Sequence, residues 1–231
     1  MLSPRRAADA VMTIVRSYGN RPPDFRARDP FEVLVATILS QNTNAKNARH
    51  ALANLRGGRP LSPRRIMQMP MRTVGSRIRV SGLYESKAKS IKAAADHVQR
   101  MHGGDMRKML RRDPESLRKE LITIRGVGPK TADIILAFCA RVPTVPVDTH
   151  IARISGRLGV VEPGAKYDQI KEGLERIIPE EQRLVGHLAL INFGREVCLA
   201  RRPKCQICPV QRLCPYYSSI IRQIRGRQPR S

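Results

Sequence analysis

Apolar residues recur every three to four positions along most of the chain, whereas strict alternation of apolar and polar residues is rare. A period near 3.6 is typical of amphipathic α-helices, and a period of two is typical of strands. Asp-Pro and Ser-Pro pairs mark helix starts, and glycines mark helix ends. The pattern therefore predicts an all-α protein with about ten to twelve helices.

The predicted helices differ in how much of their surface is apolar. The second carries Phe31 and Ile38 among other apolar residues on nearly every side, so we expect it in the core. Ser3 should cap the first helix, which the stiff Arg21–Pro23 connector follows, and two prolines make residues 141–146 an extended link. The predicted helices span about 4–18, 30–40, 44–55, 63–69, 71–78, 85–102, 114–124, 130–138, 149–158, 166–177 and 180–193.

The stretch 121–136 predicts two helices joined by a tight turn. Gly126 and Gly128 lack a β-carbon, so the backbone there can turn sharply and lie against another molecule. Free N–H groups at the start of the second helix make an anion site, although a Gly-x-Gly pair also occurs in simple interhelical turns. Asp113 should cap the first helix. The faces expected to be buried are Leu117, Leu121 and Ile124 on the first helix and Ile134, Ile135 and Phe138 on the second.

Charge indicates the partner of this turn. The 231 residues include 43 Lys and Arg against 19 Asp and Glu, which gives a net charge of +24 and a pI near 11.1. The basic residues are spread along the whole length, which favours a folded domain that binds a polyanion over a basic tail. No helix pairs a basic face with a broad apolar one, so nucleic acid is favoured over a membrane surface. No apolar run is long enough for a membrane helix and no signal peptide is present, so a cytoplasmic, nucleoid-associated protein is expected.

Four of the five cysteines lie close together, in a C-x6-C-x2-C-x5-C array. Reducing conditions argue against two disulfides, so the array predicts a metal site that holds either zinc or an iron–sulfur cluster. A structural zinc loop usually has two C-x2-C pairs and this array has one, which favours iron–sulfur. Cys139 lies outside the array and is expected to be a small core residue. The array is Cys198, Cys205, Cys208 and Cys214, and the loop inside it carries Arg201, Arg202 and Lys204, which are suited to phosphate contact.

The hairpin, the segment Val147–His150 and the cysteine array together resemble the helix-hairpin-helix DNA glycosylases of the endonuclease III family. The resemblance extends from about Pro23 to Tyr217. It implies two helical lobes: a six-helix barrel that bears the hairpin, residues 25–140, and an iron–sulfur lobe, residues 1–24 with 141–231. A DNA cleft is expected between them. It also implies that the cysteines bind a [4Fe-4S] cluster, which we interpret as structural and DNA-docking.

The resemblance also implies the reaction. Lys130 would be the nucleophile and Asp148, eighteen residues later, its proton acceptor, so the enzyme would be a bifunctional DNA glycosylase and AP lyase. Desolvation and the positive helix end should shift Lys130 toward its neutral form. The expected substrate is duplex DNA with an abasic site or a damaged base, an oxidised pyrimidine by family expectation, bound by a monomer. The residues expected to contact DNA are Gln41, Leu83, Gly126, Val127, Gly128 and His150, with Gln41 and Leu83 filling the space that a flipped base leaves.

Other functions remain open at this point. Adenine-removing relatives have a catalytic Glu where this chain has Thr37, and monofunctional thymine-mismatch relatives typically have Tyr where it has Lys130, so Lys130 favours the lyase branch. A non-enzymatic hairpin protein that binds DNA would explain the charge and the glycines but not the joint presence of Lys130 and Asp148. The chain departs from the family pattern at Asn44, usually Asp, and at Phe193, usually His.

Overall fold

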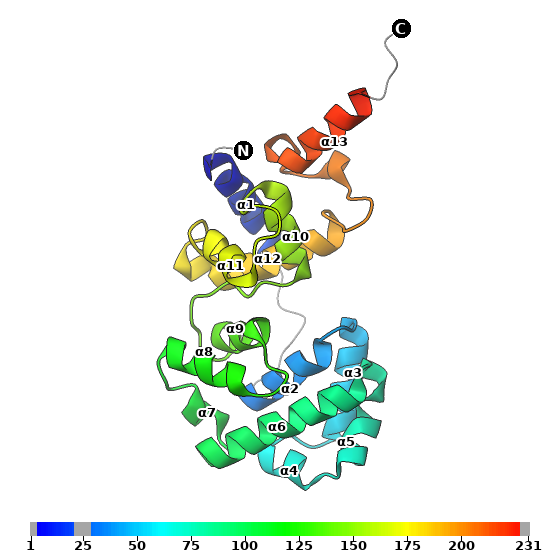
Figure 1. Cartoon of the computed structure of the whole chain (residues 1–231), viewed down its shortest axis with the longest axis vertical. Helices are drawn as coiled ribbons and strands as arrows, with labels where there is room; N and C mark the ends of the chain where they lie inside the picture. The colour runs from blue at the N-terminus through cyan, green and yellow to red at the C-terminus, as the bar shows by residue number, and fades with distance from the viewer. Residues whose placement is uncertain (1–3, 21–28, 227–231) are drawn as a thin grey trace. The chain divides into compact units, whose positions relative to one another are not determined.

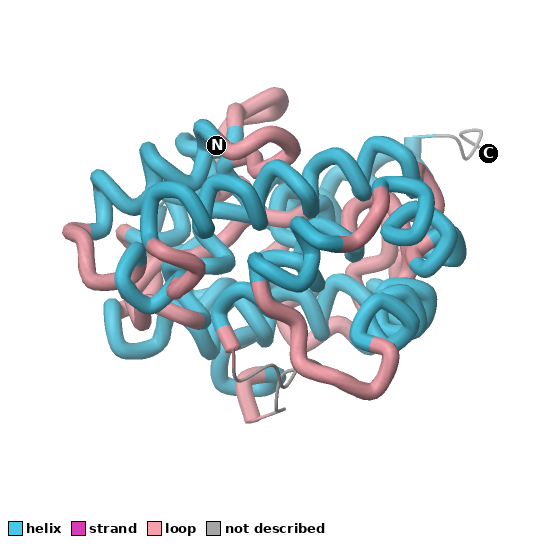
Figure 2. The backbone as a smooth tube through the Cα atoms, turned by 90° about the horizontal axis from the view of Figure 1, so that it is seen from below, coloured by secondary structure: helices cyan, strands magenta, loops and turns pink. Residues whose placement is uncertain are grey.

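The structure is a computed structural model that describes residues 4–20 and 29–226. Within them the backbone forms thirteen α-helices, four short 3-10 helices and no strand (Figures 1 and 2). The predicted all-α fold is thus confirmed. The chain divides into two compact units, which we call the central unit, residues 25–142, and the terminal unit, residues 1–24 with 143–231.

The central unit is built around α2 (Pro30–Ser40), which packs against α3, α6 and α9. Asp29 caps α2, because its Oδ1 accepts hydrogen bonds from the amides of Phe31 and Glu32 at 3.0 and 3.3 Å. Phe31 and Ile38 are buried as predicted. The other helices of this unit are α3 (Ala45–Arg56), α4 (Pro63–Gln68), α5 (Met71–Arg77), α6 (Tyr84–His102), α7 (Met106–Met109), α8 (Pro114–Thr123) and α9 (Pro129–Phe138).

The terminal unit has its own apolar core. Helix α1 packs against α12 and α10, and its Val11 and Ile14 lie among buried residues such as Ile151, Leu190 and Phe193. Phe193, a departure from the family pattern, packs edge-on against Tyr18 with ring centroids 5.4 Å apart. The helices are α1 (Pro4–Tyr18), α10 (Thr149–Leu158), α11 (Tyr167–Glu175), α12 (Arg183–Glu196) and α13 (Pro215–Gly226).

Several expectations from the sequence need correction. Thirteen helices exceed the predicted ten to twelve, because α7 and α13 were not predicted. The buried face of α9 was partly wrong: Ile135 is buried, but Ile134 and Phe138 are only half-buried while Asp133 is fully buried. The capping role of Ser3 and the connector Arg21–Pro23 lie outside the described residues. None of the helices that the structure describes combines the length and apolarity needed to cross a membrane.

The burial of Asp133 follows from an ion pair between the two hairpin helices. Arg118 on α8 donates from Nε to Oδ1 of Asp133 at 2.7 Å and from Nη2 to Oδ2 at 3.5 Å. The Asp133 side chain has no exposed surface, so its charge depends on such partners. This pair sets the rotation of α9 against α8.

Arg118→Ala should therefore lower the free energy of unfolding by about 3 kcal/mol, because it leaves a buried carboxylate with less compensation. Urea unfolding followed by circular dichroism measures the change. Arg111→Ala is the control, since Arg111 is an exposed arginine just before α8, and it should change the free energy by less than about 0.5 kcal/mol. Equal effects of the two substitutions would contradict a structural role for the pair.

Candidate catalytic residues and nucleic-acid interface

The two glycines of the hairpin turn differ in what the fold requires of them. Gly126 has φ of +79°, and a β-carbon there would lie 2.1 Å from Oγ of Ser90 on α6, so no larger residue fits. Gly128 has an ordinary extended backbone with φ of −95°, and a β-carbon there would meet no atom within 4 Å. The fold requires glycine at 126 and does not require it at 128. The absent side chain at 128 instead leaves the backbone open to an outside molecule.

The start of α9 supplies the donors beside Gly128. Lys130 is exposed in the first turn of α9, where the amides of Lys130 and Thr131 have no partner within the helix by the geometry of helix ends. Val127 is 4% exposed, and its amide donates to the carbonyl of Ile124. Its predicted contact with DNA stays a prediction.

Gln41 is held against this turn. It follows α2, and its Nε2 donates to the carbonyl oxygen of Gly126 at 3.0 Å and to Oγ1 of Thr131 at 3.3 Å. The structure thus brings Gln41 and the hairpin together, although they are 85 residues apart in the sequence. Asn44, where the family usually has Asp, caps α3, because its Oδ1 accepts a hydrogen bond from the amide of Asn47.

Leu83 lies outside the apolar core. Its relative exposure is 62%, and its backbone is left-handed with φ of +47° at the start of α6. Such a conformation is costly for a residue with a β-carbon, on the order of 1–2 kcal/mol. An exposed leucine held in a strained turn is suited to contact a partner.

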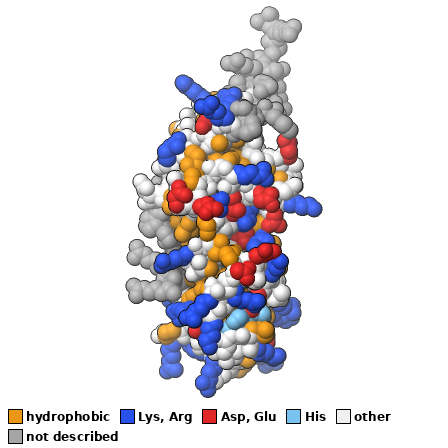
Figure 3. Space-filling model, turned by 90° about the vertical axis from the view of Figure 1, so that its left-hand side faces the viewer, with side chains coloured by type: hydrophobic (Ala, Val, Ile, Leu, Met, Phe, Trp, Pro, Cys, Tyr) orange, Lys and Arg blue, Asp and Glu red, His pale blue; other side chains and the backbone are white. Residues whose placement is uncertain are grey.

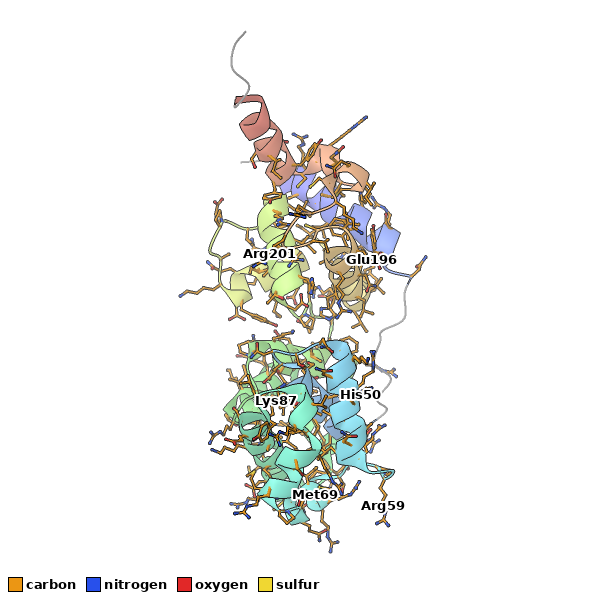
Figure 4. All side chains as sticks on the ribbon, turned by 90° about the vertical axis from the view of Figure 1, so that its right-hand side faces the viewer. His50, Arg59, Met69, Lys87, Glu196 and Arg201 are labelled. Atoms are coloured by element: carbon orange, nitrogen blue, oxygen red, sulfur yellow. The ribbon has the colours of Figure 1, made fainter. Side chains whose placement is uncertain are left out.

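Sequence analysis missed the residue that fixes both of these positions. Lys87 is buried on α6, and its Nζ donates to the carbonyls of Leu39 at 2.9 Å and Ser81 at 2.7 Å (Figure 4). Burial lowers the pKa of Lys87. Leu39 lies two residues before Gln41 and Ser81 two residues before Leu83, so one ammonium group holds both segments. The only sequence signal was a lysine at an apolar position of a helical pattern.

Lys87→Met should lower kcat/KM on lesion DNA by about 100-fold, because small displacements of positioning groups have effects of that size. Single-turnover base release measures it. Lys89→Met removes an exposed lysine of the same helix and should leave kcat/KM near the wild-type value. If Lys87→Met keeps both its helical content and full kcat/KM, the positioning role is wrong.

In the terminal unit, Asp148 caps α10. Its Oδ1 accepts hydrogen bonds from the amides of His150 and Ile151, both at 2.9 Å, which hold the half-buried carboxylate in one orientation. His150 is half-buried, its Nδ1 lies 3.1 Å from Nη2 of Arg153, and a β-carbon at Gly194 would come within 2.8 Å of its Cβ. Lys130 belongs to the central unit and Asp148 to the terminal unit.

The extended link before Asp148 is held by side chains that the sequence did not single out. Oε1 of Glu175 accepts hydrogen bonds from the Thr144 hydroxyl at 2.7 Å and the Val145 amide at 2.9 Å. Nδ1 of the buried His187 lies 2.8 Å from the carbonyl oxygen of Pro146. These bonds, made 30 or more residues away in sequence, fix the path of the link into α10.

Whether the cysteine array can hold a metal group depends on where its side chains lie. All four cysteines line one largely apolar cavity. Burial, together with the charges of the other three cysteines, raises the pKa of the Cys208 thiol to about 11, so the thiols are close enough to repel one another as thiolates. In the part of the chain that the structure describes, His97, His102 and Glu120 are the only three His, Cys, Asp or Glu residues whose ligand atoms lie within 4.8 Å of one another. No three of the four sulfurs therefore lie within 4.8 Å of one another, whereas a single zinc ion with 2.3 Å bonds would hold all four roughly 3.8 Å apart.

This wider spacing fits a polynuclear iron–sulfur cluster, which would supply a rigid, cationic cross-link for the thiolates. Arg157 lines the same cavity and donates to Sγ of Cys198 at 3.3 Å, and it also donates to the carbonyls of Leu199 at 2.7 Å and Ala200 at 3.0 Å. It thereby fixes the start of the loop that carries the exposed Arg201, Arg202 and Lys204. On the face drawn in Figure 3, Lys and Arg side chains are scattered rather than gathered in a single patch.

Purified protein should be brown, with broad absorption near about 400 nm from thiolate-bound iron. Cys205→Ser should lose iron, colour and DNA binding together, because the cluster orders the basic loop. Cys139→Ser is the matched control, since burial raises the pKa of Cys139 to about 12 and keeps it an inert thiol outside the array. Colourless wild-type protein that contains zinc and is fully active would contradict the cluster assignment.

Comparisons with known proteins agree with this geometry. Residues 35–180 match the HhH-GPD superfamily of base excision DNA repair proteins, and residues 198–214 match the iron-sulfur binding domain of endonuclease III. The fold and the cysteine site thus define a helix-hairpin-helix base excision DNA repair protein with an iron–sulfur cluster.

Similar proteins identify the family within this superfamily. Endonuclease III of Sulfolobus acidocaldarius is 36% identical over 198 residues, which cover 85% of this chain and 86% of the relative. Endonuclease III of Escherichia coli K12 is 32% identical over 91% of this chain and 95% of the relative. The chain belongs to the endonuclease III family and is a DNA glycosylase with AP lyase activity that carries a [4Fe-4S] cluster.

Solved structures show the same fold. A trapped covalent intermediate of an endonuclease III with DNA has a TM-score of 0.85 at 27% identity and covers 96% of this chain and 100% of that chain. A non-covalent endonuclease III–DNA complex matches equally well. A thermostable thymine-DNA glycosylase has a TM-score of 0.78 at 23% identity, with 93% of this chain and 98% of that chain covered, and shows the fold alone.

Proposed function

We propose that this enzyme removes oxidised pyrimidines from duplex DNA and cuts the strand at the resulting abasic site, with Lys130 as nucleophile and Asp148 as its acidic partner. The observation that carries the proposal is the exposed amine of Lys130 in the first turn of α9, two residues after a glycine that the fold does not require. An amine there can reach a sugar while the neighbouring amides bind a phosphate.

The exposure of Lys130 changes one expectation about its activation. The protein does not bury this side chain, so the predicted desolvation has to come from the DNA that covers it. Binding of the substrate thus favours the neutral amine that nucleophilic attack requires.

Asp148 has the complementary task. Its carboxylate is fixed by two backbone amides through Oδ1, so it can meet a developing positive charge without reorienting. It accepts the proton that Lys130 loses and faces the sugar cation that forms as the base departs. We propose that the two residues act on the same nucleotide.

The reaction then runs through a covalent imine. Nζ of Lys130 forms a bond to C1′ as the bond between C1′ and the base breaks, and the base leaves with a proton. Opening of the sugar ring gives a Schiff base between C1′ and the lysine. Loss of a proton from C2′ expels the 3′ phosphate, which cuts the strand by β-elimination.

The central unit also supplies groups that could replace a flipped base. Leu83 is already exposed, and Gln41 could insert once it exchanges its bonds to Gly126 and Thr131 for bonds to the unpaired base. His150, Arg201, Arg202 and Lys204 would contact the DNA backbone. The enzyme would act as a monomer in the cytoplasm, at the nucleoid, where its substrate is.

Borohydride should trap the wild-type enzyme on abasic DNA, because only an amine nucleophile forms a reducible imine. Lys130→Ala should abolish trapping and strand cleavage yet keep lesion binding, since the turn and the amides of α9 are unchanged. Lys119→Ala, which removes an exposed lysine of α8 paired with Glu115, is the control and should trap normally. A trapped complex with Lys130→Ala would assign the nucleophile to another amine.

Asp148→Asn separates the two steps, because it keeps the shape and hydrogen bonding of the side chain but removes its charge. Base release should fall by at least about 100-fold, whereas cleavage of a ready-made abasic site should fall less. A panel of duplexes, each with one lesion, tests the preference for oxidised pyrimidines. If wild-type enzyme forms no trapped complex with any of these duplexes, the proposed lysine Schiff-base mechanism is wrong.

A further inference from the structure

A cluster of two histidines and one carboxylate lies outside the residues assigned above. His97 and His102 come from the C-terminal end of α6, and Glu120 comes from α8, the first helix of the hairpin. Nε2 of His97 lies 2.8 Å from Oε1 of Glu120, and Nε2 of His102 lies 2.6 Å from the same oxygen. Three potential ligand atoms from two helices thus converge on one point.

The chemistry of this set is that of a transition-metal site. Two imidazole nitrogens and one carboxylate oxygen are a ligand set that zinc uses in proteins, with a fourth position left for water. In tetrahedral geometry with bonds of about 2.0–2.1 Å, neighbouring ligand atoms are about 3.3 Å apart. The two nitrogen–oxygen separations, 2.8 and 2.6 Å, are shorter than this, so a bound ion would replace both hydrogen bonds and the imidazoles would move away from Oε1.

The Glu120 carboxylate is oriented by a third partner, Arg112. Arg112 donates to the other oxygen, Oε2, and so orients the carboxylate while leaving Oε1 to face the histidines. Partners that fix a metal ligand from behind in this way are typical of metal sites.

The site is partly open to solvent. The side chains of His97 and His102 are 21% and 11% exposed, so an ion can enter without unfolding of the helices. Figure 3 shows histidine side chains at the surface among Lys and Arg side chains. The ring centroids of the two histidines are 6.1 Å apart.

We propose that His97, His102 and Glu120 bind one zinc ion, which links α6 to α8. The ion would hold the first helix of the hairpin on the helix that also carries Lys87 and Ser90. This site is separate from the cysteine array, and the proposal does not depend on the proposed function. Binding requires that each histidine carry its remaining proton on Nδ1, so that Nε2 is free to coordinate.

The test uses the brown, cluster-loaded enzyme. Zinc is titrated in a competition with a coloured chelator, and bound zinc is then counted by mass spectrometry after desalting. Wild-type enzyme should bind one zinc ion per chain with no loss of absorption near about 400 nm, because the cysteine array keeps its iron. Cobalt in place of zinc should give the visible bands of a four-coordinate site.

Glu120→Gln keeps the size of the side chain but loses its charge, and His97→Asn removes one nitrogen ligand. Each should weaken zinc binding by at least about 10- to 100-fold, the range found when even a supporting partner of a metal ligand is lost. His50→Asn is the control, since His50 is an exposed histidine on α3 (Figure 4), and its zinc affinity should equal that of the wild type.

Circular dichroism confirms that each variant is folded, and the two variants check one another if either is unstable. If wild-type enzyme binds no zinc, or binds it as tightly after both substitutions, the three residues form a hydrogen-bonded cluster only and the proposal is wrong. Loss of absorption near about 400 nm on addition of zinc would place the ion in the cysteine array and would equally overturn it.

Discussion

The hairpin turn can lie on α6 only because residue 126 has no side chain. Its left-handed backbone and its approach to Ser90 leave no room for a β-carbon. The carbonyl of the same residue accepts the hydrogen bond from Gln41. Lys87, three residues before Ser90 and therefore on the same face of α6, holds the segments that lead to Gln41 and Leu83. One face of α6 thus supports the hairpin turn, Gln41 and Leu83, which are the parts of the central unit that we propose to contact DNA.

Much of this fold could be predicted from the sequence because its signals are local. Asp29-Pro30 and Asp113-Pro114 mark two helix starts, and in the structure both aspartates accept the capping hydrogen bonds. The apolar face of α8, with Leu117 and Leu121, is buried as its spacing predicts. The cysteine array is likewise a local pattern, so the sequence could indicate a metal site without any knowledge of the fold.

What the sequence could not predict depends on contacts between distant residues. Lys87 looks like an imperfection in an apolar pattern until the carbonyls of Leu39 and Ser81 are placed beside it. Glu175 and His187 carry no signal that connects them with the link before Asp148. Helix α7 is too short to show a period, and the Arg-rich end of the chain masked α13. The buried face of α9 was misjudged because an ion pair, rather than apolar residues alone, sets its rotation.

We infer that the two glycines of the turn serve different purposes. The fold requires Gly126, whereas Gly128 keeps the backbone open for DNA to bind. The most direct test measures unfolding free energy and affinity for abasic DNA in Gly126→Ala and Gly128→Ala. Gly126→Ala should lose at least about 2 kcal/mol of stability from the clash and the positive φ. Gly128→Ala should keep wild-type stability within about 0.5 kcal/mol but bind DNA at least tenfold more weakly, because its new methyl group lies where DNA approaches. Wild-type affinity in a stable Gly128→Ala variant would contradict the account.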